Sequence, residues 1–193
     1  GWDIAGLAGG VEPTLVFRFW AGDDIDATLV PDDEGMLYVG VEYERETGRS
    51  QELGQILKLD PGRPDDPLVW AVTDRPFVGS GVWATPAVHR DLVIVPTASG
   101  RVHGIDRASG AIRWSLDLPG PVWSSPTIVD DVLVIGDCSG RVRAFDVAQT
   151  AMPPTELWQV PTGKCIEASA AVWDGTVYIG SRDGYLYALR DVP

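Results

Sequence analysis

An internal repeat limits this chain to a small set of folds. Residues 82–106 match residues 122–146 at an offset of 40 residues, without a gap. Residues 172–189 match residues 128–145 at an offset of 44 residues. A further copy, stretched in its middle, precedes them at residues 36–60. Repetition at this period is typical of architectures in which one supersecondary unit is stacked on copies of itself.

Each copy has the pattern of a short β-meander. In the copy that begins at Val122, apolar runs at Pro126–Val129, Val132–Ile135 and Arg141–Asp146 are separated by Asp, Ser and Gly residues. Such runs predict antiparallel strands joined by tight turns. A fourth strand with a tryptophan follows in three copies, at Pro67–Trp70, Ala111–Trp114 and Glu156–Val160. Four short strands per ~40–45 residues are typical of a propeller blade.

The strand order predicts how a ring of blades would close. We expect one all-β domain over residues 1–193, with blades at about 24–70, 82–114, 122–160 and 166–190. The last copy lacks a fourth strand, while Pro13–Trp20 resembles a spare one. With the four strands of a blade lettered A to D, the order is D-ABCD-ABCD-ABCD-ABC. Pairing of the first strand with the last blade, as its fourth strand, would remove an exposed sheet edge.

The repeat resembles the pyrroloquinoline-quinone-like (PQQ-like) β-propeller family. Residues 100–114 match the family pattern Gly-x-apolar-x-Ala-apolar-Asp-x-x-(Thr/Ser)-Gly-x-x-x-Trp, with Gly104 at the small position. Residues 177–189 match the preceding part of that pattern, and the likeness covers nearly all of residues 13–190. The resemblance is specific for fold. It is weak for function, because the family includes quinoprotein dehydrogenases, a barrel-assembly lipoprotein and sensor domains.

The resemblance also implies more blades than this chain supplies. Members of the family commonly have seven or eight blades. We therefore expect half of an eight-bladed ring, either cut from a longer product, which is the favoured reading, or dimerising with a second copy. A small closed four-bladed ring is the alternative. A half-ring would bury its edges against another half, so a protein partner or self-association is predicted.

Three of the eight tryptophans have a structural explanation. Trp70, Trp114 and Trp158 recur at one position of the repeat, where their large apolar faces can seal neighbouring blades. We expect them to pack between blades and assign them no chemistry.

Charge excludes two classes of partner. The chain has 15 basic and 28 acidic residues, for a net charge of −13. Nucleic acids and anionic lipids require a cationic surface, so we expect neither as a partner. No apolar run reaches the roughly 18 residues of a membrane-spanning helix, so membrane insertion is not expected.

Residues that open the first strand of each blade are candidates for a binding site. In the aligned copies these residues are Asp24, Trp83, Trp123 and Glu167, although extra residues near Pro31 leave the first position open. Two carboxylates and two indoles around a channel mouth could hold a cation or stack against a flat ligand. A hydrated channel mouth without a ligand is the alternative.

For the dehydrogenase branch of the family, the resemblance implies a quinone cofactor (PQQ) that lies above a calcium ion. Glu, Asn and Asp side chains hold that ion, and an adjacent Cys-Cys pair often lies against the cofactor. This sequence contains no Cys-Cys dipeptide and no Asn. Beyond Glu167 no ligand can be matched, so we expect no cofactor and assign no catalytic or metal-binding residue.

The two cysteines fall on the same predicted face of adjacent blades. Cys138 lies in a B–C loop and Cys165 opens the next strand A. The two cysteines could form a disulfide, which would suit an extracytoplasmic (periplasmic or secreted) protein. Two free buried thiols are the alternative.

Three further features carry weak expectations. His89 and His103 have no partner that the sequence identifies, so a general-base role is unsupported. The insert Glu42–Glu52 is expected to form a charged, solvated hairpin and, as the one irregular loop, a partner contact.

The sequence therefore predicts a non-catalytic propeller scaffold or binding domain. A quinone- and calcium-dependent alcohol or sugar dehydrogenase and an extracellular sensor module remain the alternatives.

Overall fold

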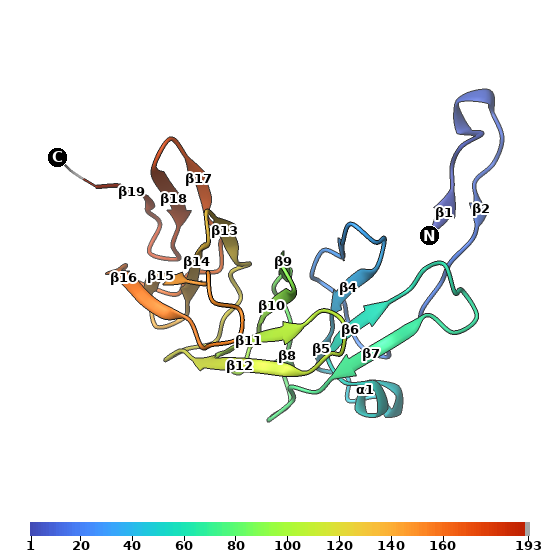
Figure 1. Ribbon diagram of the computed structural model, residues 1–193, viewed down its shortest axis with the longest axis horizontal. Helices are drawn as coiled ribbons and strands as arrows, with labels where there is room; N and C mark the ends of the chain where they lie inside the picture. The colour runs from blue at the N-terminus through green and yellow to red at the C-terminus, as the bar shows by residue number, and fades with distance from the viewer. Residues whose placement is uncertain (192–193) are drawn as a thin grey trace.

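The computed structural model describes residues 1–191 and consists mainly of antiparallel meanders (Figure 1). Four sheets follow one another along the chain, and in each sheet strands that are consecutive within the repeat pair with each other. The first sheet comprises β3 (Val30–Pro31), β4 (Leu37–Gly40), β6 (Ile56–Leu59) and β7 (Leu68–Val72). The second comprises β9 (Ala87–His89), β10 (Leu92–Pro96), β11 (Arg101–Asp106) and β12 (Ile112–Asp117).

The third and fourth sheets repeat this plan. The third comprises β13 (Thr127–Val129), β14 (Val132–Asp137), β15 (Arg141–Asp146) and β16 (Thr155–Pro161). The fourth has three strands, β17 (Ala171–Trp173), β18 (Thr176–Gly180) and β19 (Leu186–Leu189). The predicted all-β propeller fold is confirmed, while the number of blades in a complete ring stays a prediction.

Local sequence explains the tight turns. Asp130 and Asp131 join β13 to β14 with φ angles of 48° and 64°. Two successive residues with positive φ form the type I′ turn whose twist suits a two-residue hairpin, and aspartate tolerates this conformation better than most residues. The register then pairs Val129 with Val132.

The sheets are arranged as an open arc. Strand β13 contacts both β9 and β17, so the first strands of neighbouring sheets converge on the inner side. Strands β7, β12 and β16 lie on the outer side, and the two termini lie at opposite ends of the long axis (Figure 1). This arrangement corresponds to part of a propeller ring with its channel beside the first strands.

Apolar residues fill each interface between neighbouring sheets. One cluster joins the first and second sheets through Tyr38, Trp70 and Ile105. A second cluster joins the second and third sheets through Trp114 and Phe145, and a third joins the third and fourth. Successive residues of a strand point to opposite faces, so one strand can supply side chains to the clusters on both sides of its sheet.

The repeated tryptophans lie within these clusters. Trp70 and Trp114 are buried and Trp158 is half-buried. A Cβ atom added at Gly104 would come within 2.1 Å of the Trp114 ring, so this position of the repeat needs a small residue. Trp70 also donates a hydrogen bond of 3.1 Å from Nε1 to the carbonyl oxygen of Arg107 in the next sheet.

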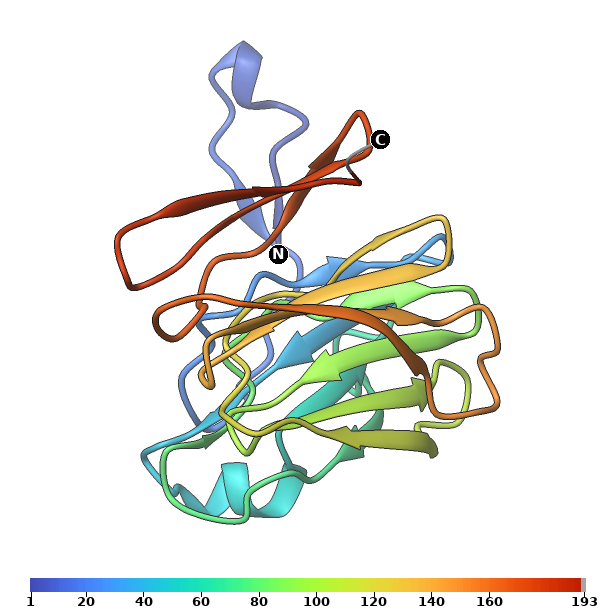
Figure 2. The ribbon, with the colours of Figure 1, turned by 90° about the vertical axis from the view of Figure 1, so that its left-hand side faces the viewer.

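The N-terminal segment lies at the opposite end of the arc from the last sheet. Strand β1 (Trp2–Asp3) pairs with β2 (Thr14–Leu15), and the 3₁₀ turn η1 (Leu7–Gly9) lies between them. This hairpin projects beyond the sheets (Figure 2). Within residues 1–191, β19 pairs only with β18, so the expected loan of residues 13–20 to the last blade does not occur inside one chain. Phe17 and Phe19 instead pack on the outer face of the first sheet.

The insert Glu42–Glu52 differs from the expected solvated hairpin. Strand β5 (Glu42–Tyr43) pairs with β8 (Ser80–Gly81), and helix α1 (Gly48–Leu53) follows. Thr47 caps the helix, accepting a hydrogen bond of 3.1 Å from the Ser50 amide at its Oγ1. Glu42 and Tyr43 are buried, because the insert folds back onto the loop that leads into the second sheet.

Substitution of Trp114 tests whether the inter-sheet clusters hold the fold together. We expect Trp114→Ala to lower the free energy of unfolding by about 3–5 kcal/mol in urea titrations, because it leaves a large cavity. Leu157→Ala, on the corresponding strand of the next sheet, removes a side chain that is 50% exposed. That control should change the unfolding free energy by less than about 1 kcal/mol. Equal losses in the two variants would contradict the assignment.

Candidate functional site: the channel mouth and the two free ends

Four side chains at the starts of the innermost strands line a cavity of about 240 Å³. They are Asp26, Trp83, Trp123 and Glu167, one from each of the four repeats. Each follows an apolar residue that anchors the segment, such as Val82, Val122 and Ile166, which are fully buried. We call these four residues the channel mouth.

The first repeat contributes Asp26 to this cavity, where Asp24 was expected. The segment Ile25-Asp26-Ala27-Thr28 aligns with Val82-Trp83-Ala84-Thr85 without a gap. The Thr28 amide donates a hydrogen bond of 3.1 Å to Thr85 Oγ1, which fixes this register in space. Asp24 instead forms an ion pair with Arg45 at 2.7 Å. The turn between β3 and β4 is longer than in the other repeats, so counting backward from the second strand reached the wrong aspartate.

The two indoles of the channel mouth stack on each other. Their ring centroids are 5.4 Å apart and the planes differ by 17°. Both Nε1 atoms are buried and have no hydrogen-bond partner among the described residues. Trp114 Nε1, in the cluster between the second and third sheets, also has no partner among the described residues, so unpaired indole donors are not particular to the channel mouth.

A buried glutamate lies behind Asp26. Glu42 is 3% exposed, and its Oε1 atom has no hydrogen-bond partner among residues 1–191. Burial raises the pKa of Glu42 to about 7, and the nearby charges of Asp26, Glu44 and Asp24 act in the same direction. The protonated carboxyl can donate a hydrogen bond to Asp26. This side of the channel mouth is therefore strongly acidic.

The fourth sheet exposes the face that its neighbours bury. Tyr178 and Leu186 occupy the repeat positions of Val134 and Val142, which are buried between the third and fourth sheets. In the fourth sheet these residues are 38% and 75% exposed, and Trp173 beside them is 77% exposed. We call this surface the free face of the fourth sheet. It has the composition of a blade interface without the next blade.

The first sheet presents the complementary end. Leu37, Val39 and Leu59 are the repeat equivalents of Leu133, Ile135 and Phe145, which face the preceding sheet in the interior. In the first sheet, Phe17 and Phe19 cover them. Phe17 matches the repeat position of Trp158. Residues 14–20 therefore lie on the first sheet as the last strand of a preceding blade would.

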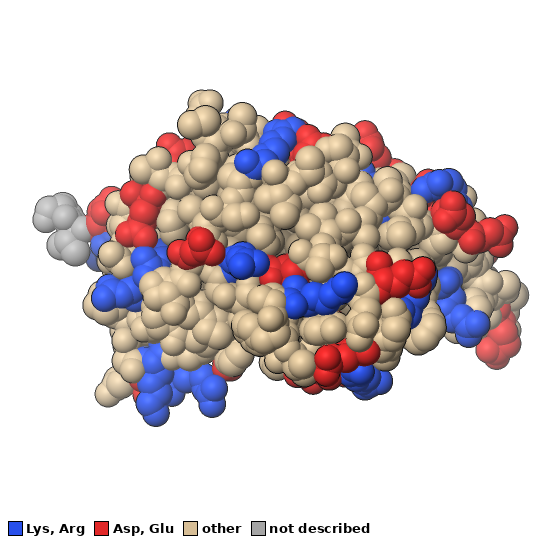
Figure 3. All heavy atoms as spheres, turned by 90° about the horizontal axis from the view of Figure 1, so that it is seen from below, with Lys and Arg blue, Asp and Glu red and all other residues tan. Residues whose placement is uncertain are grey.

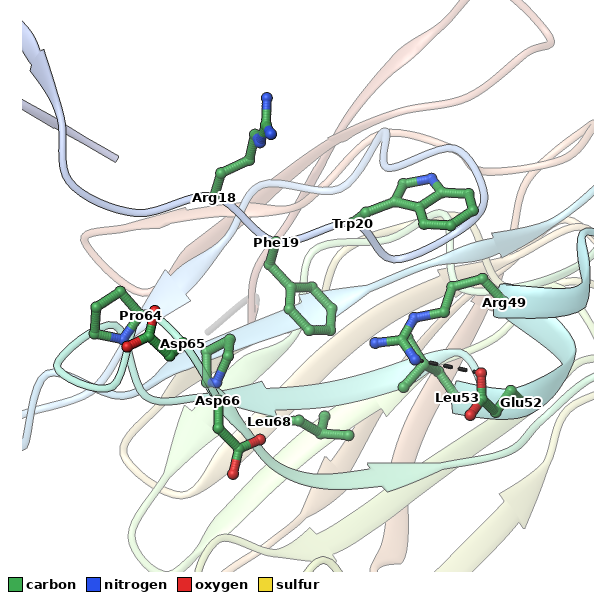
Figure 4. A pocket seen from close by; sticks show the side chains of 11 residues that line it. Arg18, Phe19, Trp20, Arg49, Glu52, Leu53, Pro64, Asp65, Asp66 and Leu68 are labelled. Carbon is green, nitrogen blue, oxygen red and sulfur yellow. Dashed lines mark hydrogen bonds and ion pairs between the residues drawn. The ribbon is translucent and has the colours of Figure 1, made fainter.

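A groove of about 730 Å³ runs beside this segment (Figure 4). It is bounded by Arg18, Phe19 and Trp20, by helix α1 and by residues 64–68. Phe19 points into the groove, and Arg49 extends toward it from α1, with its guanidinium 5.8 Å from the Phe19 ring centre. Together with the exposed Trp20, the groove makes this end a second candidate binding surface.

The sulfur atoms of Cys138 and Cys165 lie next to each other, as in a disulfide pair. Cys138 follows β14 of the third sheet, and Cys165 precedes β17 of the fourth. The bond would tie the fourth sheet to the third on the side of the channel mouth.

Both histidines have carboxylate neighbours that the sequence did not identify. His103 Nε2 lies 2.9 Å from Asp74 Oδ2, and His103 Nδ1 lies 2.7 Å from Ser115 Oγ. Burial raises the pKa of Asp74, but hydrogen bonds from His103, Thr97 and Ser99 outweigh it and hold that pKa below its ordinary value. This network ties the loop after the first sheet to the second sheet. His89 Nε2 lies 3.1 Å from Asp131 Oδ1 in the neighbouring repeat.

The outer face carries mixed charge. Lysine and arginine side chains lie beside aspartate and glutamate on the face that Figure 3 shows, without a continuous basic surface. Arg113, for example, contacts both Asp91 and Asp106. No helix within the described part of the chain is long and apolar enough to span a membrane.

The channel mouth does not fit a quinone with calcium. The carboxylates of that quinone need basic partners, whereas the mouth presents Asp26 and Glu167. Calcium takes six to eight oxygen ligands. Over residues 1–191, no three His, Cys, Asp or Glu side chains gather in a way that could hold a metal ion. We therefore derive no redox step for this chain.

The raised pKa of Glu42 predicts a pH-dependent stability. Between the ordinary pKa of 4.5 and about 7, the folded protein keeps a proton that the unfolded chain has released. The free energy of unfolding should therefore fall as pH rises through this window, by roughly 2–3 kcal/mol from this group. Glu42→Gln removes the titration. Urea titrations at pH 4.5 and pH 7.5 should show the smaller decline in this variant, and parallel declines would refute the assignment.

The cysteine pair makes a second prediction. We expect the denatured, unreduced protein to show no reaction with a thiol reagent, and about two thiols per chain after reduction. The double variant Cys138→Ser/Cys165→Ser should lose about 2–4 kcal/mol of unfolding free energy. Free thiols in the unreduced protein would show that the bond does not form.

Comparisons with known proteins agree with this architecture. The sequence profile of one family, described as "Outer membrane protein assembly factor BamB", matches residues 53–191. No curated protein sequence matches the chain. The structure of BamB from Moraxella catarrhalis is similar, with 25% identity and a TM-score of 0.69, over 90% of this chain and 49% of that one. This chain thus spans about half the length of that BamB structure.

Two other structures share the fold alone. The computationally designed Ika4 protein is 16% identical with a TM-score of 0.64, over 87% of this chain and 91% of that one. A quinohemoprotein alcohol dehydrogenase, ADHIIG from Pseudomonas putida HK5, is 18% identical with a TM-score of 0.61, over 85% of this chain and 29% of that one. Since the family profile covers most of the repeats, the chain belongs to the BamB family of PQQ-like β-propeller repeat proteins.

Proposed function

We propose that this chain is a non-catalytic scaffold unit that completes a propeller ring by packing another half-ring against its two free ends. The observation that carries the proposal is the exposure of Tyr178 and Leu186 at repeat positions that are buried in the interior interfaces. Packing a second sheet on this face would be favourable, because exposing its apolar side chains to water costs free energy.

The occupant that fits both ends is a second copy. Residues 14–20 already lie on the first sheet in the place of a last strand, and β19 has a free edge. Residues 14–20 of one copy can therefore extend the fourth sheet of the other copy while Phe17 stays packed on its own first sheet. Two such contacts, related by a two-fold axis, would close a ring of eight sheets.

The family supports a role in protein interaction. BamB is described as an assembly factor for outer-membrane proteins, and a ring without a catalytic constellation is suited to holding partners. The same description and the paired cysteines support an extracytoplasmic location, because disulfides persist in oxidising compartments.

Solution mass tests the proposal. We expect light scattering to give roughly 42 kDa, twice the 20.8 kDa of one chain. Leu186→Asp places a charge on the free face of the fourth sheet and should yield a folded monomer. Met152→Asp changes an equally exposed apolar residue away from both ends and should leave the mass unchanged.

Amide hydrogen exchange provides an independent measurement. Amides of β19 that have no acceptor in one copy should become protected as the protein concentration rises, and Leu186→Asp should abolish this effect. A wild-type protein that stays at 20.8 kDa at about 100 μM would contradict self-association.

A further inference from the structure

The channel mouth has the chemistry of a site for a small organic cation. Its cavity of about 240 Å³ is lined by two indoles and two carboxylates, and no lysine or arginine belongs to its lining. Indole faces attract cations through the ring quadrupole, and this attraction grows when water is excluded. Carboxylates at the edge of such a cavity add long-range attraction for positive charge.

Charge around the cavity favours a cation over an anion. Glu167 is partly neutralised by Arg182, whose Nη1 atom lies 3.1 Å from its Oε1. Asp26 is backed by Glu42, and Asp24 and Glu44 lie close enough to affect that carboxyl. An anion would therefore meet the Asp26 carboxylate, since Asp24 is paired with Arg45 and Glu42 lies behind Asp26. A bare metal ion would not find the ligand number it needs, because the described residues form no cluster of three donors.

The indoles supply a second, independent observation. Trp83 and Trp123 stack at 5.4 Å, and their buried Nε1 groups have no partner among the described residues. Because the two rings stack on each other, the ring faces that a ligand can meet are those turned away from the stack.

We propose that the channel mouth binds a small alkylammonium or quaternary ammonium compound, held by the faces of Trp83 and Trp123 and by the charges of Asp26 and Glu167. The four residues belong to one chain, so the site does not depend on ring closure. Closure by a second copy would double the set around one channel.

Choline is the probe, because its trimethylammonium group fits a cavity of this size. The matched control is 3,3-dimethylbutan-1-ol, which has nearly the same shape and no charge. Binding is followed through the ¹⁵N–¹H signals of the tryptophan indoles. The signals of residues 83 and 123 are assigned from the variants Trp83→Phe and Trp123→Phe.

We expect choline to shift these two indole signals with a dissociation constant in about the millimolar range, and the neutral compound to bind at least about tenfold more weakly. Asp26→Asn/Glu167→Gln should weaken choline binding by about tenfold or more and leave the protein folded. Asp174→Asn, in the turn between β17 and β18, should leave binding unchanged.

Repeating the titration in the Leu186→Asp variant separates this proposal from ring closure, since a monomer should bind choline as well as the wild type. Equal shifts with choline and with its neutral analogue would overturn the proposal. So would shifts confined to the other indoles, or no shift at about 50 mM choline.

Discussion

Face-to-face packing between neighbouring sheets is the interaction on which this structure depends. Each meander is too thin to have a core of its own, so its apolar residues are buried only when another sheet lies on each face. Leu133 and Ile135 serve the interface with the second sheet, while Val134 serves the interface with the fourth. The second strand of each sheet, such as β10 and β14, is therefore apolar on both sides, and the repeated tryptophans pack in the gaps between sheets.

The same dependence leaves apolar surface at the two ends of the arc. A sheet at the end of the arc keeps the apolar pattern of an interior sheet, because the repeat unit is the same. Trp173 and Leu186 are therefore exposed where an interior sheet would have its neighbour. At the other end, Phe17 and Phe19 reduce the exposed apolar area without closing the edge. These two surfaces are the basis of the proposed association with a second copy.

The repeat in the sequence was sufficient to predict the strands, their order and the places where the tryptophans pack. It was sufficient because alternation of apolar residues and Gly or Asp turns specify a meander locally. Two features could not be read from it. The network of Asp74 and His103 joins residues 29 positions apart and needs the relative placement of two sheets. The insert forms a helix because Thr47 caps it and Leu53 packs on the first sheet. The charged composition of the insert does not indicate either contact.

The placement of Asp24 was wrong for a related reason. The buried alanine and the threonine after the mouth residue mark the register, as Ala27-Thr28 in the first repeat and Ala84-Thr85 in the second. Aligning from the strands through a turn of altered length lost this register. Aligning from the Ala-Thr pair would have reached Asp26.

A bond between Cys138 and Cys165 would have a mechanical consequence. Terminal units of a stacked array tend to separate first, since they are held by a single neighbour. The crosslink would hold the last three-stranded unit at its inner edge, so that separation would begin at its outer strand. Reduction would remove this link and let the fourth sheet move relative to the third. An oxidising environment would keep the free face of the fourth sheet at a fixed angle.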